Sequence, residues 1–278
     1  MLLYGVSYGV VLFAISVGLT VTLGLMRVMN LAHGALAAAG GYTALALAGA
    51  ALPYPLAIAA ATIAVAASGA VLERLIIRRL YGASELDQAL LTIGLMYVFV
   101  AAVNWLFGPG VRPARLPNLL DQSLVFGNLT IQLYRLAMIA VGAVLLLGLW
   151  ALFARTGFGA RLRAAVDNPS MAGVVGIRVP ALVTAAFCLG SGLAAFGGAV
   201  GAPMLPMEPT YPFRYLTLVL VVVALAGSGE ILASAAAAAA VGILDTAARS
   251  LFPDAGGFTI YLLLLAALPW QQRRKGLA

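Results

Sequence analysis

Long uncharged stretches dominate the pattern of apolar and polar positions along the chain. No charged residue occurs in 1–26, 28–72 or 136–153. A helix rises 1.5 Å per residue, so about 20 residues cross the roughly 30 Å hydrocarbon core of a bilayer. The first stretch therefore accommodates one transmembrane helix, and the second accommodates two.

Nine apolar runs predict helices. They lie at 3–26, 31–51, 55–77, 89–107, 131–153, 180–202, 212–227, 231–250 and 257–270. The runs 212–227 and 257–270 are short for a full crossing, which is typical of broken or re-entrant helices. We therefore predict an all-α polytopic membrane protein, a single domain over residues 1–278 with about 8–10 transmembrane helices.

Composition supports the same class, because 63% of the 278 residues are hydrophobic and only 9% are charged. Soluble domains carry roughly 25% charged residues. The first apolar run has no Lys or Arg before it and no small-residue cleavage site. We interpret it as a retained transmembrane helix rather than a signal peptide.

The formal net charge of +7 comes from basic residues at the ends of the apolar runs, which indicates membrane orientation rather than nucleic-acid binding. With the N-terminus outside and the C-terminus in the cytoplasm, 11 of the 16 basic residues fall on the cytoplasmic side. These are Arg27, Arg74, Arg78, Arg79, Arg155, Arg161, Arg163, Arg178, Arg273, Arg274 and Lys275. Because short basic loops stay inside, we predict this topology.

Two loops interrupt the apolar pattern. The segment 108–130 mixes Pro, Gly and polar residues and is expected outside, with a short interfacial helix. The segment 154–180 contains the densest Arg cluster and is expected in the cytoplasm. Within it, Ala160 to Val166 is a good helix former, so one or two short helices are predicted over 156–178.

Catalytic and metal-binding patterns are absent from the sequence. Lys275 is the only lysine, so no phosphate-binding Gly-x-x-x-x-Gly-Lys loop exists, and His33 is the only histidine. Cys188 has no partner for an intrachain disulfide. We predict no enzymatic activity and no cofactor in this chain. Asp245 and Arg249 lie four residues apart on one predicted helix face and are expected to neutralise each other.

The segment from Gly24 to Gly34 reads Gly-Leu-Met-Arg-Val-Met-Asn-Leu-Ala-His-Gly and is followed by Gly40-Gly41-Tyr42. It resembles the Asn-x-Ala-His-Gly segment of the branched-chain amino acid ABC transporter permeases, in the form typical of the first of their two membrane subunits. Asn30, His33 and Gly34 carry this resemblance. It implies that these three residues shape a translocation path, whereas the alternative is that they fasten one helix to its neighbours.

A second block, 156–179, is similar to the cytoplasmic coupling loop of the same family, and the run through Leu193–Gly198 agrees with it. The resemblance implies that a short helix here docks on an ATPase subunit, with Ala164 and Ala165 in close contact. Its coupling residues would be Gly159, Arg161, Arg163, Ala164, Asn168 and Gly176. Arg161 and Arg163 would otherwise be simple membrane anchors. The segment 225–233 departs from the glycine-rich family pattern.

The resemblance implies a permease subunit of an ATP-driven importer for branched-chain amino acids in the bacterial cytoplasmic membrane. Its expected partners are a second permease subunit, two ATPase subunits that bind ATP and Mg, an extracytoplasmic binding protein and membrane lipid. Two alternatives remain open at this point. One is a permease for urea or short-chain amides, and the other is an autonomous channel, secondary transporter or non-transporting scaffold.

Overall fold

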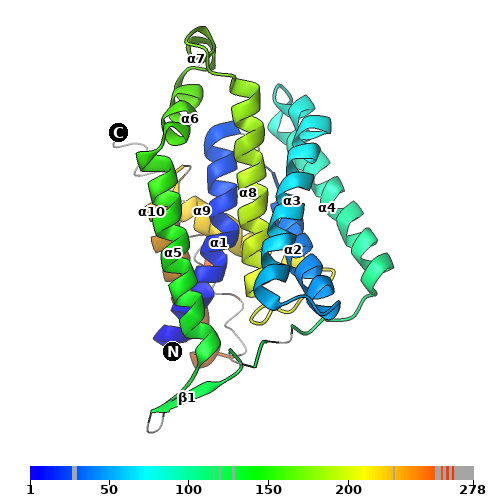
Figure 1. Ribbon diagram of the computed structural model, residues 1–278, viewed down its shortest axis with the longest axis vertical. Helices are drawn as coiled ribbons and strands as arrows, with labels where there is room; N and C mark the ends of the chain where they lie inside the picture. Colours follow the sequence, from blue (N-terminus) through cyan, green and yellow to red (C-terminus); the bar gives the residue numbers. More distant parts are fainter. Residues whose placement is uncertain are drawn as a thin grey trace.

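The computed structural model describes residues 1–26, 30–114, 116–118, 120–126, 129–227 and 229–253, together with 258, 261, 262 and 265. Within them, six helices are long and apolar enough to cross a membrane. The chain is an all-α polytopic membrane protein, as predicted. Figure 1 shows the helices running along one common direction, with a β-hairpin at one end and two short helices at the other.

Eight predicted runs correspond to observed helices. Their bounds are α1 (Leu2–Met26), α2 (His33–Gly49), α3 (Tyr54–Leu75), α4 (Glu85–Phe107), α5 (Leu133–Arg155), α8 (Val179–Gly201), α9 (Tyr211–Ala226) and α10 (Ile231–Leu251). A short 3-10 helix, η1 (Ile77–Leu80), follows α3. The predicted run 257–270 lies outside the described residues, apart from four single positions.

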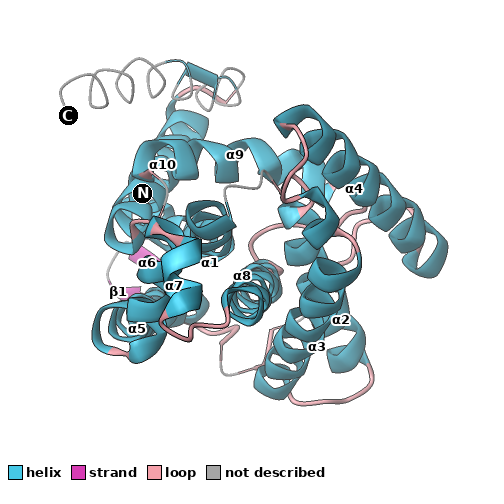
Figure 2. Ribbon diagram, turned by 90° about the horizontal axis from the view of Figure 1, so that it is seen from above, coloured by secondary structure: helices cyan, strands magenta, loops and turns pink. Residues whose placement is uncertain are grey.

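The helices α1 and α8 form the centre of the bundle. Figure 2 shows them between α2, α3 and α4 on one side and α5 and α10 on the other. In the most apolar window of α1, 78% of the residues are buried, against 17% in α4 and in α5. Outer side chains such as Trp105 (85% exposed) and Val144 (71% exposed) are apolar, as expected for surfaces that face lipid.

Glycine allows the closest helix contacts. A Cβ atom on Gly40 of α2 would collide with the backbone of Ala195 on α8, and one on Gly198 would collide with the carbonyl oxygen of Ala37. Burial of apolar area gives little drive for association in lipid, so close backbone approach supplies much of the packing energy. Gly40 and Gly198 therefore serve helix packing at the α2–α8 crossing.

The helix α2 begins halfway along the bundle rather than at its end. The His33 ring, in its first turn, hydrogen-bonds the carbonyl oxygen of Ile15 at 2.8 Å, and Ile15 lies near the middle of α1. Gly34, the next residue, approaches Pro212 at the start of α9. Two helices of 17 and 16 residues thus begin beside each other within the bundle. The predicted run 31–51 agrees with α2 to within two residues at each end.

The predicted interfacial helix in 108–130 is wrong for the residues described. The structure has an antiparallel hairpin there, with β1 (Ser123–Phe126) paired to β2 (Leu129–Gln132). Val125, Thr130 and Ile131 are β-branched, which favours strands over a helix. Earlier in the loop, Arg112 forms a β-bridge to Met207 and so ties the loop to the segment before α9.

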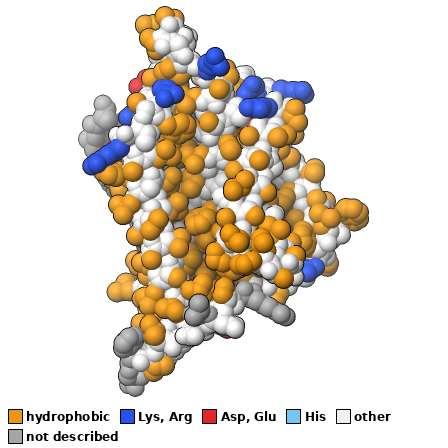
Figure 3. Space-filling model, in the orientation of Figure 1, with side chains coloured by type: hydrophobic (Ala, Val, Ile, Leu, Met, Phe, Trp, Pro, Cys, Tyr) orange, Lys and Arg blue, Asp and Glu red, His pale blue; other side chains and the backbone are white. Residues whose placement is uncertain are grey.

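The two ends of the bundle differ in charge. We call them the hairpin end, with the first turns of α1 and α5, and the coupling end, with α6 (Gly157–Asp167) and α7 (Pro169–Val174). On the face shown in Figure 3, the Lys and Arg side chains gather mostly near the coupling end, and the flank below them is largely hydrophobic. Arg27 and the basic residues 273–275 lie outside the described residues.

Candidate functional site

The segment Asn30–Gly34 forms a tight, buried turn into α2. The Asn30 side-chain oxygen accepts a hydrogen bond from the backbone N–H of Ala32 at 3.1 Å, and Leu31 N–H donates to the Thr92 hydroxyl at 3.2 Å. Asn30 is 2% exposed and His33 1% exposed. The Asn30 amide nitrogen has no hydrogen-bond partner among the described residues. Of the two side chains, His33 is thus fastened to α1, whereas Asn30 keeps free donor capacity inside the bundle.

Gly34 is where α2 meets the start of α9. A Cβ atom at this position would lie 2.8 Å from the carbonyl oxygen of Pro212, closer than real Cβ contacts. The sequence predicts that Asn30, His33 and Gly34 shape a translocation path. The structure brings the three together at mid-depth, beside two helix starts, in a packing arrangement that also suits the alternative of helix fastening.

The predicted short helices between α5 and α8 are confirmed as α6 and α7. The Thr156 hydroxyl caps α6 by accepting from Phe158 N–H at 3.2 Å. The Asn168 side chain caps α7 by accepting from Met171 N–H at 3.0 Å. Gly176 then adopts φ +86°, a left-handed conformation that glycine adopts easily. Asn168 and Gly176, both coupling candidates, therefore have defined structural roles as cap and turn.

The remaining coupling candidates divide between two sides of α6. Gly159 packs against the backbone of Phe153 at the end of α5, and the Arg163 guanidinium donates to the same Phe153 carbonyl at 2.8 Å. Arg161 and Ala164 are exposed and three residues apart, so they share a face. Ala165 is 7% exposed and packs inward, so the expectation that it contacts a partner is wrong. Arg161 and Ala164 therefore form an exposed face, and Arg163 is exposed as well, although its guanidinium is bonded to Phe153.

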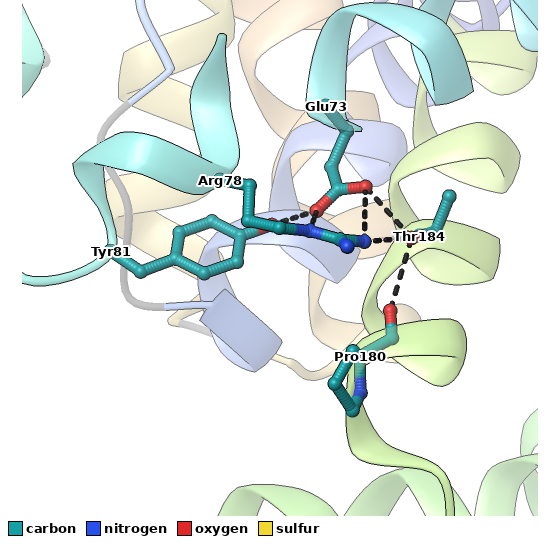
Figure 4. Close-up of polar contacts among 5 residues, drawn as sticks. All are labelled: Glu73, Arg78, Tyr81, Pro180 and Thr184. Carbon is teal, nitrogen blue, oxygen red and sulfur yellow. Dashed lines mark hydrogen bonds and ion pairs between the residues drawn. The ribbon is translucent and has the colours of Figure 1, made fainter. Parts of the chain in front are cut away.

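A buried carboxylate at the coupling end was missed by the sequence analysis. Glu73, near the end of α3, has a fully buried side chain that accepts hydrogen bonds from Arg78, Tyr81 and Thr184 (Figure 4). Arg78 donates to both carboxylate oxygens at 3.1 Å, Tyr81 donates at 2.6 Å and Thr184 at 2.7 Å. We call these four residues the Glu73 cluster.

The Glu73 cluster joins three segments. Glu73 belongs to α3, Arg78 to η1 and Thr184 to the first turns of α8, directly after the coupling helices. Burial and the Glu73 hydrogen bond raise the pKa of Tyr81, so its hydroxyl keeps its proton at neutral pH. The same hydrogen bond raises the pKa of Arg78. The signal in the sequence that could have indicated this cluster is Glu73 itself, an acidic residue within the apolar run 55–77.

Charged residues also meet at the hairpin end. The predicted Asp245–Arg249 pair is confirmed, with 2.9 Å between Asp245 Oδ2 and Arg249 Nε. Arg135 and Arg214, which the sequence analysis did not single out, line a cavity with this pair. They come from α5 and α9, so no local spacing in the sequence indicates that they meet.

The segment 225–233, which departs from the family pattern, forms the turn between α9 and α10. Gly227 and Gly229 adopt φ values of +82° and +90°, where glycine is favoured. Glu230 precedes α10 and makes no side-chain capping bond. The glycines needed for this turn are therefore retained, although Ser228 between them lies outside the described residues.

Comparison with known proteins agrees with this architecture. A family model described as a branched-chain amino acid transport system permease component matches residues 1–268. A high-affinity branched-chain amino acid transport system permease protein, BraD from Pseudomonas aeruginosa, is 27% identical over 221 residues, which cover 74% of this chain and 70% of BraD. No solved structure matches the chain. The chain therefore belongs to the permease component family of branched-chain amino acid transport systems.

Proposed function

We propose that this chain is the membrane-spanning permease subunit of an ATP-driven importer that moves branched-chain amino acids into the cell. The observation that carries the proposal is the pair α6 and α7, which project beyond the bundle in a chain whose family match is nearly complete (Figure 1). Exposed Arg161 and Ala164 on α6 present a small basic face at the coupling end. A basic face suits an acidic groove on a partner.

The proposed assembly contains a second permease subunit, two ATPase subunits and an extracytoplasmic binding protein. ATP and Mg would be bound by the ATPase subunits, because this sequence has no phosphate-binding loop. Movement of α6 and α7 would reach α3 through the Glu73 cluster, since Thr184 lies five residues after the start of α8. The cluster thus offers a rigid connection from the coupling helices to the bundle.

We place the coupling end in the cytoplasm of a bacterial cell and the N-terminus outside. Arg74, Arg78, Arg79, Arg155 and Arg178 flank the helices at the coupling end, in agreement with the preference of short basic loops for the inside. Single cysteines at Ser123 and Ser170, in a Cys188→Ser background, provide the test. An impermeant maleimide should label position 123 in intact cells and position 170 only after lysis; the reverse pattern contradicts this orientation.

For the translocation path we retain Asn30, His33 and Gly34. Support comes from their burial at mid-depth and from the Asn30 amide nitrogen, which has no partner in the described part of the chain and could donate to a polar solute. Replacing His33 by Gln keeps a hydrogen-bond donor toward Ile15, whereas Leu removes it. Uptake should therefore fall more in His33→Leu than in His33→Gln, and equal loss at equal protein level would point to packing alone.

Reconstitution tests the proposed function. The chain should be co-expressed and co-purified with the proposed second permease and ATPase subunits and assayed in proteoliposomes for uptake of radiolabelled leucine, isoleucine and valine. ATP-dependent uptake that needs the ATPase subunits is the expected result. Uptake by the chain alone would favour a channel or secondary transporter, uptake of urea or acetamide in place of leucine would reassign the substrate, and no uptake of any solute would favour a scaffold.

A further inference from the structure

A cavity of about 490 Å³ opens at the hairpin end between α1, α5, α9 and α10. Small-molecule sites typically enclose roughly 300–1,000 Å³ and combine apolar walls with a few polar groups. We call this cavity the arginine pocket. Its ionisable and aromatic lining residues are Tyr4, Tyr8, Arg135, Arg214, Tyr215, Asp245 and Arg249.

Arg135 is the cation of this pocket that forms no ion pair among the described residues. Arg214 is paired with Glu208, and Arg249 with Asp245, each at 2.9 Å, whereas Arg135 forms no ion pair with any residue that the structure describes. Among the described residues, its guanidinium donates to Gln132 Oε1 at 3.2 Å and Ser7 Oγ at 3.3 Å, and it lies 4.0 Å from the Tyr4 ring. Because a guanidinium has five N–H groups, most of its donors stay available.

Asp245 is the complementary feature. Its Oδ2 accepts from Arg249, but its Oδ1 is buried and has no hydrogen-bond partner among the described residues. A buried oxygen of a carboxylate is costly to leave unbonded. The Arg249 side chain is 51% exposed, so it can turn toward water and leave the carboxylate to another cation. An ammonium group has three donors and can bond both oxygens.

We propose that the arginine pocket binds the substrate amino acid as a zwitterion. The carboxylate pairs with the Arg135 fork, the ammonium group replaces Arg249 on Asp245, and the aliphatic side chain lies against Leu205 and Leu218, which also line the cavity. The proposal rests on the proposed function and narrows it, because it names the groups that recognise the backbone of the amino acid. The pocket would be an intermediate binding site on the extracytoplasmic side of the membrane.

Competition binding on the purified permease–ATPase complex, without the binding protein, tests the proposal. Radiolabelled leucine is the probe, and the competitors are leucinamide, which lacks the carboxylate, and 4-methylpentanoate, which lacks the ammonium group. In the wild type, unlabelled leucine should compete at least about tenfold better than either analogue, as expected from one charge-assisted contact. The variants are Arg135→Gln and Asp245→Asn, with Arg74→Gln as a charge-matched control at the coupling end.

The two variants should lose discrimination in opposite ways. Arg135→Gln should bind leucine and leucinamide equally while still rejecting 4-methylpentanoate, and Asp245→Asn should do the reverse. Arg135→Lys keeps the positive charge but lacks the planar guanidinium, so it should retain part of the preference for leucine over leucinamide. This variant provides the test if Arg135→Gln does not assemble with the ATPase subunits. If each variant lost its preference for leucine over both analogues equally, or kept both preferences unchanged, the proposed binding site would be contradicted. A wild type that imports no branched-chain amino acid overturns the proposed function instead.

Discussion

The Glu73 cluster and the arginine pocket are both groups of charged residues at helix ends, yet they differ in hydrogen bonding. Both carboxylate oxygens of Glu73 accept two hydrogen bonds. Oε1 accepts from Arg78 and Tyr81, and Oε2 accepts from Arg78 and Thr184. In the arginine pocket, Arg135 lacks an acidic partner and Asp245 Oδ1 lacks a donor among the described residues. A satisfied cluster stabilises a joint between helices, whereas an unsatisfied one retains the capacity to bind a solute.

The comparison predicts its largest stability effect at Glu73. Replacing it by Gln keeps the volume but removes the charge that three donors share, so unfolding free energy should fall by about 3 kcal/mol. Thermal unfolding in detergent, read from a fluorescent thiol probe on Cys188, measures the change. Glu230→Gln is the matched control, because Glu230 is exposed and makes no capping bond; it should shift stability by under about 1 kcal/mol. Equal losses of stability in Glu73→Gln and Glu230→Gln would contradict a special stabilising role for the Glu73 cluster.

An intermediate effect is expected where α2 meets α9, between the two ends. In Gly34→Ala the new Cβ would lie 2.8 Å from the Pro212 carbonyl oxygen, so a helix must shift, at a cost of about 1–3 kcal/mol. Gly94→Ala on α4 is the control, because no atom lies within 4 Å of its Cβ position. Thermal stability and leucine uptake should be measured on both. Lost uptake with unchanged stability would instead support the translocation path over helix fastening.

A smaller effect is expected at Tyr81. Tyr81→Phe removes one hydrogen bond to the Glu73 carboxylate, and bonds to charged groups contribute about 1.5–3 kcal/mol when buried; partial exposure of Tyr81 should bring this to about 1 kcal/mol. Tyr97→Phe, on an exposed tyrosine, should leave the melting temperature unchanged. Because the raised pKa keeps Tyr81 protonated, its contribution should be constant from pH 6 to pH 9 and should decline only as the pH rises above about 10. A decline below pH 8 would contradict this assignment.

The smallest stability effect is expected at Arg135. Its hydrogen bonds are long and its contact with the Tyr4 ring is typically worth about 0.5–1 kcal/mol, so Arg135→Gln should lower stability by less than about 1 kcal/mol. The same variant should have the large ligand-binding defect described above. A destabilisation as large as that of Glu73→Gln would show that both ends are structural.

Much of the fold was predictable because hydrophobic length is a local property. Apolar runs, with charges at their ends, predicted α1, α3, α5 and α8 with bounds that differ by only a few residues. Local helix propensity over Ala160 to Val166 likewise indicated short helices between α5 and α8. The error lies at 123–132, where the predicted interfacial helix is a hairpin, because strand pairing depends on contacts between two segments. The depth at which α2 begins likewise depends on its contacts with α1 and α9.

The sequence by itself determined the class of this protein, the positions of its long helices and the segments that resemble the permease family, because each depends on residues close together in the chain. Only the tertiary structure decided which ionisable groups meet. Thr184 lies 111 residues after Glu73, and Arg135 and Asp245 come from α5 and α10. Whether such charges neutralise each other or remain available to a solute depends on distances between helices, which no local pattern specifies.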